Sequence, residues 1–297
     1  MFISVIVPSL NSPVINLTLE SLEKQTLPQD QFEVIVVGMD NDGLIHENEL
    51  VRFEHTDGPL SPAEARNRGV ARAHGDIIAF TDADCIADPH WLEMIAERFS
   101  NPEVTVMGGG IEFDTGNYWT LSDNLSMFYE YLAVHPAGWR SQLPSLNLMI
   151  RRDAFEDIGG FDEVRYPRPS GEDADLTIRL RKGGSRLFFE PGAKIYHKPR
   201  RNSLVDLLRH AYFQGRYSTK IDARYAEGGS IPELLRSRIA LVILSAFFAA
   251  LATVRVFSWN YILKHYWHTI PAIYLAKIAW CIGASGSSLR SISLSED

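Results

Sequence analysis

Two aspartates separated by one small residue, Asp82 and Asp84, are the part of the chain best suited to chemistry. They follow the apolar run 76–80, Asp-Ile-Ile-Ala-Phe, which is typical of a buried strand. Two carboxylates at a strand end put negative charge at the carboxyl edge of a sheet, where open α/β folds bind ligands. Such oxygen donors suit Mg²⁺ or Mn²⁺ shared with substrate phosphates. An Asp-rich turn without a ligand is the alternative, because aspartate also favours turns.

Three further groups of residues have the right chemistry. Glu172 and Asp173 stand at a predicted helix start, where the exposed N–H groups keep a carboxylate ionised. Acidic residues are also ordinary at a helix start, so this position alone assigns them no role. His197 carries an imidazole that suits Mn²⁺ better than Mg²⁺, or it is a surface histidine after a strand. Arg66 offers a planar, permanently charged fork for phosphates, and an exposed basic helix face is the alternative.

Alternating strand and helix patterns position these residues. Continuous apolar runs at 3–8, 33–38 and 76–80 predict buried strands. The spacing of apolar residues over 14–25 predicts an amphipathic helix. Another helix is expected to run from Ser61, as N-cap, to Ala73, with proline and glutamate at the positions of a capped first turn. This alternation indicates an α/β fold with a mostly parallel sheet flanked by helices.

The second half of the sequence predicts further elements around the candidate residues. Glycine pairs at 159–160 and 183–184 end two of the helices. We expect strands at 104–110, 145–151 and 194–197, and helices opening at 88–92, within 116–138, and over 152–158 and 172–183.

The composition excludes several classes of protein. A hydrophobic content of 45% and a charged content of 22% are those of a folded chain. The formal net charge of -8 argues against a general nucleic-acid binder. The two cysteines, Cys85 and Cys281, are too far apart in sequence for a disulfide framework or a metal motif, which favours a reducing compartment. The start of the sequence lacks the pattern of a secretory signal, so the catalytic part is expected in the cytoplasm.

The composition changes near residue 230. The run 239–254 carries no charge, and a second apolar run, 269–284, has Lys277 in its middle. Between them lie aromatic residues of the kind found at membrane interfaces. A membrane hairpin or an interfacial anchor is expected, and a helical pair packed in water is the alternative. Arg236 and Arg238 favour a cytoplasmic start. The predicted domains are therefore a catalytic domain over 1–225 and a hydrophobic helical tail over 226–297.

The chain resembles the family 2 glycosyltransferases of GT-A fold, in particular bacterial enzymes that synthesise glycans at membranes. The resemblance covers roughly residues 2–220 and is specific because the motifs share the family's order. They are Val-Pro-Ser-Leu-Asn at the end of the first strand, Ala-Arg-Asn-x-Gly at 65–69, Phe-x-Asp-x-Asp-Cys at 80–85, Gly-Gly-Phe-Asp-Glu at 159–163 and Gly-Glu-Asp-x-Asp-Leu at 171–176.

The resemblance implies roles for the acids and the histidine. Asp84 would ligate a divalent metal, Mn²⁺ or Mg²⁺, and Asp82 would contact the ribose, or the metal through water. His197 matches a further metal ligand. Asp173, beside Glu172, matches the general base of a single displacement, which inverts the sugar's configuration.

The resemblance also implies a binding site for a nucleotide sugar. It would include Pro8, Asp40, Arg66, Asn67, Asp82, Asn147 and Arg216. One departure matters, since the second strand of the family often ends in Val-Asp-Asp-Gly-Ser. Here the sequence from 37 to 43 is Val-Gly-Met-Asp-Asn-Asp-Gly. Asp40, Asp42 or neither would therefore contact the nucleobase or ribose. The identity of the nucleobase therefore stays open, and a UDP- or GDP-linked sugar is expected as the donor.

The function expected from this resemblance is metal-dependent transfer of a sugar to a lipid-linked or surface-glycan acceptor. The enzyme would act at the cytoplasmic face of the cell membrane, without a nucleic-acid partner. A degenerate subunit that binds nucleotide sugars without turnover is an alternative, favoured by the altered loop. A nucleotidyltransferase is another, disfavoured because the first strand lacks a glycine-rich basic loop.

Overall fold

The computed structural model describes residues 1–225 and 237–286, which form two compact units. The first unit consists of residues 1–113 and 131–199, and the second of residues 114–130 and the chain from 200 onward. The predicted composition change near 230 and Arg236 lie outside the described residues. The division of function at residue 225 stays a prediction.

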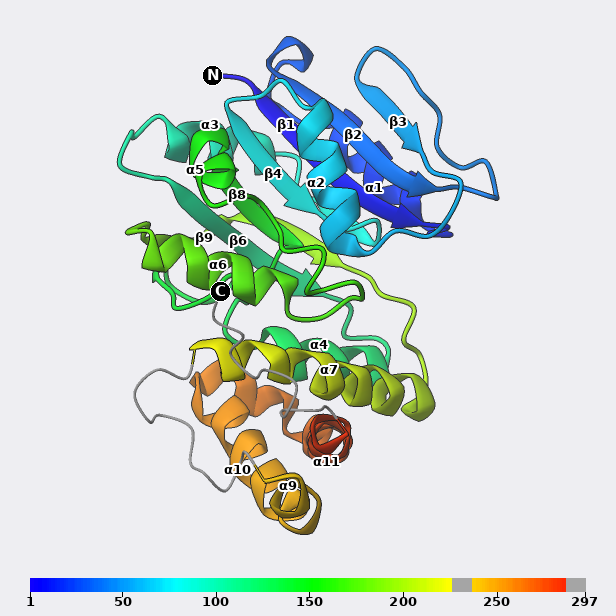
Figure 1. Cartoon of the computed structure of the whole chain (residues 1–297), viewed down its shortest axis with the longest axis vertical. Helices are drawn as coiled ribbons and strands as arrows, with labels where there is room; N and C mark the ends of the chain where they lie inside the picture. Colours follow the sequence, from blue (N-terminus) through cyan, green and yellow to red (C-terminus); the bar gives the residue numbers. More distant parts are fainter. Residues whose placement is uncertain (226–236, 287–297) are drawn as a thin grey trace, which may run out of the picture. The chain divides into compact units, whose positions relative to one another are not determined.

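The first unit is built on a nine-stranded sheet in the order β3-β2-β1-β4-β8-β6-β9-β5, with β7 paired to β9 (Figure 1). The pairs β3–β2, β2–β1, β1–β4 and β6–β9 are parallel, whereas β8 runs antiparallel to β4 and β6. The strands are β1 (Ile3–Leu10), β2 (Phe32–Met39), β3 (Val51–His55), β4 (Ile77–Thr81), β5 (Cys85–Ala87), β6 (Val106–Phe113), β7 (Gly138–Trp139), β8 (Asn147–Arg151) and β9 (Leu187–His197).

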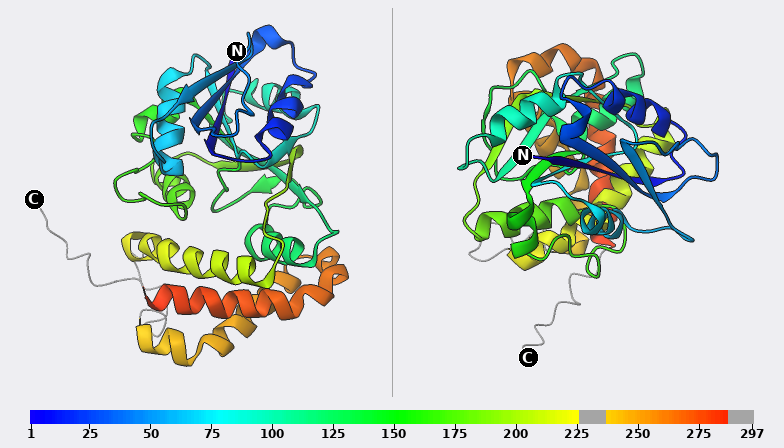
Figure 2. Two further views of the ribbon diagram at one scale, coloured as in Figure 1. Left: turned by 90° about the vertical axis from the view of Figure 1, so that its right-hand side faces the viewer. Right: turned by 90° about the horizontal axis from the view of Figure 1, so that it is seen from above.

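Helices cover both faces of this sheet (Figure 2). On one face α2, α5 and α6 bury Val70, Phe155 and Leu176 against strand residues such as Ile78 and Leu148. The helices of this unit are α1 (Ile15–Glu23), the 3-10 turn η1 (Gln29–Gln31), α2 (Pro62–Arg72), α3 (Trp91–Phe99), α5 (Arg152–Asp157) and α6 (Glu172–Lys182). The predicted fold class, an α/β fold with a mostly parallel sheet flanked by helices, is confirmed.

The second unit is helical. Its helices α7 and α11 lie side by side (Figure 2), because glycines let their backbones meet. A Cβ on Gly215 would lie 2.0 Å from the carbonyl oxygen of Trp280, and one on Gly283 would lie 2.0 Å from that of Tyr212. The elements are α4 (Tyr118–Phe128), α7 (Leu204–Tyr225), α9 (Arg238–Ile243), α10 (Ser245–Ser258), the 3-10 segment η2 (Tyr261–Thr269) and α11 (Ile270–Ser285).

The described part of the predicted apolar tail is mainly helical, but its first apolar run is broken at Leu244 between α9 and α10. Among residues 1–225 and 237–286, no helix combines the length and the apolar character needed to cross a bilayer.

Candidate active site

The aspartate pair lies on a tight turn between β4 and β5. The amide of Cys85 donates to the carbonyl oxygen of Asp82 at 3.1 Å, which closes the turn at the carboxyl end of β4. The turn is fixed to β9 because the amide of Lys198 donates to the carbonyl oxygen of Asp84 at 2.9 Å. Both carboxylates therefore lie at the sheet edge where the sequence predicts them.

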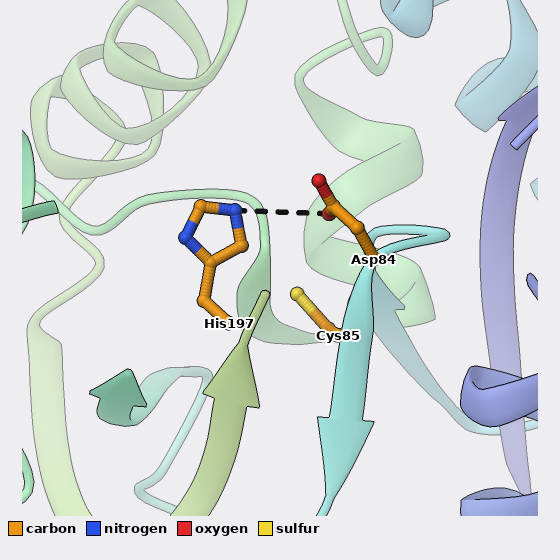
Figure 3. A group of neighbouring side chains, drawn as sticks. All are labelled: Asp84, Cys85 and His197. Carbon is orange, nitrogen blue, oxygen red and sulfur yellow. Dashed lines mark ion pairs between the residues drawn. The ribbon is translucent and has the colours of Figure 1, made fainter. Parts of the chain in front are cut away.

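Asp84 and His197, the two predicted metal ligands from distant parts of the chain, lie together (Figure 3). The Nε2 atom of His197 is 3.7 Å from Oδ1 of Asp84. Cys85 completes a group in which one ligand atom from each residue lies within 4.8 Å of the others. The His197 and Cys85 side chains are buried, and Asp84 is half-buried.

This donor set fits a divalent cation. A carboxylate and an imidazole at this separation can hold one ion between them, since ligands about 2.1 Å from a tetrahedral metal lie roughly 3.4 Å apart. Burial raises the pKa of the Cys85 thiol well above its usual value, and the nearby Asp84 and Asp82 charges add to this. With a hard ion such as Mn²⁺, the protonated thiol would stay outside the coordination sphere, leaving Asp84 and His197 as the ligands.

Asp82 has a different partner. Arg66, from α2, donates through Nη2 to Oδ1 of Asp82 at 2.8 Å and through Nη1 to Oε1 of Glu172 at 3.1 Å. The Arg66 side chain is only 3% exposed, and its guanidinium lies 5.5 Å from the centre of the Phe161 ring. One buried cation thus joins the turn that bears the aspartate pair to the first residue of α6.

Asp173 follows Glu172 at the start of α6 and is half-buried. Its Oδ2 accepts from the amide of Ser145 at 3.3 Å, and its Oδ1 from the amide of Ala174 at 2.8 Å. Burial raises the pKa of Asp173 to about 6, the Glu172 charge adds to the shift, and Arg66 opposes it. A carboxylate with this pKa is ionised at neutral pH and is a stronger base than an ordinary aspartate.

The backbone before α6 is held in a strained conformation. Ser170 has φ of 115°, a region that residues with a side chain rarely adopt. Its amide donates to Oε2 of Glu172 at 2.9 Å. Glu172 therefore binds both Arg66 and its own loop, which fixes the position of the neighbouring Asp173.

Asn67 holds the Gly-Gly-Phe-Asp-Glu loop. Its Oδ1 accepts from the amide of Phe161 at 3.0 Å, and its Nδ2 donates to the Phe161 carbonyl at 2.9 Å and to Glu163 at 3.0 Å. These contacts tie α2 to the loop, and its predicted contact with the nucleotide stays a prediction.

Asn147 is fully buried inside the sheet unit. Its Oδ1 accepts from the indole N–H of Trp91 at 2.9 Å, and its Nδ2 donates to the carbonyls of Gly110 and Ala193 at 3.0 and 2.9 Å. These bonds join α3, β6 and β9. The predicted contact of Asn147 with the donor sugar stays a prediction.

The remaining predicted nucleotide contacts lie on β1, on the loop after β2 and in the helical unit. Pro8 is opposite Val37 in the β1–β2 pairing. Asp40 accepts from the amide of Ile45 at 2.7 Å, which closes the altered loop on itself. Arg216 is half-buried in α7 of the second unit. Their roles in nucleotide binding stay predictions.

Sequence comparison supplies the decisive observation on the family. The profile of the family described as Glycosyl transferase family 2 matches residues 4–159, more than half of the 297 residues. The chain belongs to this family.

Similar proteins come from bacteria and archaea. The family 2 chain is 34% identical over 173 residues to a pre-mycofactocin glycosyltransferase of Mycobacterium tuberculosis, a match covering 56% of this chain and 36% of that protein. It is 31% identical over 199 residues to the glycosyltransferase AglE of Haloferax volcanii, covering 63% of this chain and 64% of the relative. A glucosyl-dolichyl phosphate glucuronosyltransferase of the same archaeon is 23% identical over 71% of this chain and 73% of its own. The chain thus spans only part of the first two relatives.

Solved structures share the fold. The mannosyltransferase PcManGT of Pyrobaculum calidifontis, in complex with GDP-Man and Mn²⁺, has a TM-score of 0.59 at 19% identity, over 92% of this chain and 85% of its own. S. aureus TarS 1-349, in complex with UDP-GlcNAc, has a TM-score of 0.54 at 18% identity, over 95% and 90%. The expected GT-A fold and the resemblance to family 2 are confirmed.

Sequence reasoning gave Cys85 no role in the site. It directly follows the aspartate pair in the family 2 chain, and the β5–β9 register places it opposite His197. The local signals were its adjacency to Asp84 and its place at the end of the Phe-x-Asp-x-Asp-Cys motif.

Proposed function

We propose that this family 2 chain transfers a sugar from a nucleoside-diphosphate sugar to a lipid-linked or surface-glycan acceptor. The observation that carries this proposal is the link made by Arg66 between Asp82 and Glu172. Through it, the turn that bears the candidate metal ligand Asp84 and the helix that bears the candidate base Asp173 belong to one ion-paired group. Donor activation and proton removal are the two functions a sugar transfer needs.

The proposed reaction is a single displacement. The acceptor hydroxyl oxygen bonds to the anomeric carbon as the bond from that carbon to the diphosphate breaks, and Asp173 takes the hydroxyl proton. When bound, a divalent ion at Asp84 and His197 would neutralise the leaving diphosphate. Arg66 balances the charge of Asp82 and Glu172, and Glu172 holds the base-bearing loop. Attack from the side opposite the leaving group inverts the configuration.

Similar structures hold GDP-Man with Mn²⁺ and UDP-GlcNAc. They support a UDP- or GDP-sugar donor and a divalent ion for this chain.

A lipid-linked acceptor is supported by the relative named for a dolichyl phosphate substrate. Exposed apolar side chains on α9 and α10 also recur every three or four residues, as on a helix that lies in a membrane interface. These are Ile239, Val242, Ile243, Phe247, Leu251 and Val254. We propose that they dock on the cytoplasmic face of the membrane.

Vesicle co-sedimentation tests the docking. The double variant Phe247→Glu, Leu251→Glu should lose binding to anionic lipid vesicles. Val164→Glu is the control, because Val164 is 88% exposed in the sheet unit. Equal binding by both variants, or none by the unsubstituted chain, would contradict the membrane proposal.

A panel of nucleotide sugars tests the proposed activity. Thermal shift with and without Mn²⁺ identifies the donor, since a bound ligand raises apparent stability by mass action. Release of nucleoside diphosphate with the identified donor and an acceptor extract then measures transfer. Asp173→Asn should retain the thermal shift and lose at least 100-fold in transfer. Donor binding without release in the unsubstituted chain would indicate the degenerate subunit, and pyrophosphate release from a nucleoside triphosphate would indicate a nucleotidyltransferase.

A further inference from the structure

The thiol of Cys85 lies beside two candidate ligands of a hard metal ion. Cys85 and His197 are direct partners in the antiparallel pairing of β5 and β9, so their side chains leave the same face of the sheet. Figure 3 shows the sulfur directed toward the space between the Asp84 carboxylate and the His197 ring. One oxygen, one sulfur and one nitrogen donor meet within 4.8 Å.

This donor set differs from that of a site built for Mg²⁺ or Mn²⁺ alone. Thiolate ligands select Zn²⁺ and similar borderline or soft ions, and Zn²⁺ also binds mixed sites more tightly than Mn²⁺ does. The two buried donors are held on paired strands, so a metal ion would meet them already positioned. Adding a sulfur ligand should therefore favour Zn²⁺ far more than Mn²⁺.

We propose that Asp84, Cys85 and His197 form a mixed oxygen, sulfur and nitrogen site that binds Zn²⁺ through the Cys85 thiolate and thereby displaces Mn²⁺. On binding, the thiol proton passes to the buffer and a sulfur–metal bond forms, with no change of oxidation state. The inference rests on the proposed function only for the identity of Mn²⁺ as the competing ion. The binding measurements need no turnover, so loss of one proposal leaves the other standing.

Cobalt is the spectroscopic probe, because Co²⁺ bound by a thiolate gives an intense charge-transfer band in the near ultraviolet. The full chain should give this band, and so should Cys281→Ser, in which Cys85 is the sole remaining cysteine. Cys85→Ser should lose it. A missing band in Cys281→Ser, or a band that persists in Cys85→Ser, overturns the proposal. Because Cys281→Ser keeps Cys85, its spectrum tests the proposal even if the protein does not fold when Cys85 is replaced.

Zn²⁺ affinity provides the second measurement, by competition with a chromophoric chelator. The Kd for Zn²⁺ should rise at least tenfold in Cys85→Ser, while the Kd for Mn²⁺ changes less than threefold. Added Zn²⁺ should also release bound Mn²⁺ from the unsubstituted chain, seen as the electron paramagnetic resonance signal of free Mn²⁺. Mn²⁺ that stays bound at a stoichiometric amount of Zn²⁺, or equal Zn²⁺ affinities, would reject the site.

Discussion

Arg66 donates to Glu172 across 106 residues of sequence, with Nη1 3.1 Å from Oε1. The same guanidinium binds Asp82 at 2.8 Å, so a single buried cation neutralises two carboxylates. A planar fork can serve both partners at once, which a lysine ammonium cannot do with the same geometry. This link joins the two halves of the proposed active site.

Removing Arg66 should therefore destabilise the protein. Arg66→Met leaves the buried Glu172 without its charge partner, and breaking such a pair costs about 3–5 kcal/mol. Arg66→Lys should cost less, because the charge remains. Arg68→Met on the same helix is the control, since Arg68 is 48% exposed and its pair with Glu64 is worth less than about 1 kcal/mol. Urea unfolding measures the stability of all three variants. Equal stability of Arg66→Met and Arg68→Met would contradict a stabilising role for the ion pairs of Arg66.

The pH dependence of turnover should report Asp173. Its pKa is raised to about 6 by burial and by the Glu172 charge. A general base acts only when ionised, so kcat/KM should fall as the pH is lowered through about 6 and be level above it. Glu172→Gln removes a neighbouring negative charge and should move this limb to lower pH. If Glu172→Gln left the acidic limb of the kcat/KM profile unchanged, or if kcat/KM at pH 4.5 equalled its value at neutral pH, Asp173 would be excluded as the base.

The burial of Asp173 should also lower the free energy of unfolding of the protein at neutral pH. Its pKa is about 6 in the folded protein against 3.8 for an ordinary aspartate, so the folded state holds the proton more tightly. The contribution of this carboxyl to stability is full below about pH 4 and is lost as the pH rises through about 6. Asp173→Asn cannot ionise, and should exceed the unsubstituted protein in stability by up to about 3 kcal/mol at pH 7.5 but not at pH 4. Urea unfolding at both pH values tests this, and a less stable Asp173→Asn at pH 7.5 would refute it.

Mn²⁺ should stabilise the protein through Asp84 and His197. At a hundredfold excess over its Kd, a ligand of the folded state adds about 2.7 kcal/mol, and chelation by EDTA should remove this gain. Asp84→Asn and His197→Asn should lose most of the Mn²⁺-dependent rise in Tm. Asp157→Asn, at an exposed position on α5, should keep it. A rise in Tm that survives in Asp84→Asn would place the ion elsewhere.

Local patterns predicted the elements that carry the site. Continuous apolar runs gave β1, β2 and β4, because strands buried on both faces leave no polar alternation. The cap of α2 was also readable, since the Ser61 hydroxyl oxygen accepts from the amide of Glu64 as predicted. The short edge strand β3, with the sequence Val-Arg-Phe-Glu-His, was missed because charged residues interrupt it.

Long-range partners could not be predicted from local patterns. Arg66 has the chemistry of a phosphate ligand, but its carboxylate partners lie 16 and 106 residues away in sequence. Asn147 was assigned to the donor site from the family resemblance, and no local pattern predicted the hydrogen bonds from its amide to backbone carbonyls of β6 and β9. The antiparallel course of β8 likewise depends on chain topology rather than on the pattern of its residues.

Lys277 should limit the stability of the helical unit at neutral pH. Its Nζ donates to the carbonyl oxygen of Ser126 at 2.8 Å, and burial lowers its pKa to about 8 although Asp123 opposes the shift. The folded state thus holds this proton more weakly than the unfolded chain, so the stability that the lysine contributes above about pH 10.5 is lost as the pH falls through about 8. Lys277→Met should therefore be more stable than the unsubstituted protein at pH 7, by up to about 3 kcal/mol, and the gap should shrink to less than about 1 kcal/mol by pH 10. Lys264→Met, at an exposed position of η2, should show no such difference in urea unfolding at either pH, and a gap of the same size in both variants would contradict the burial argument.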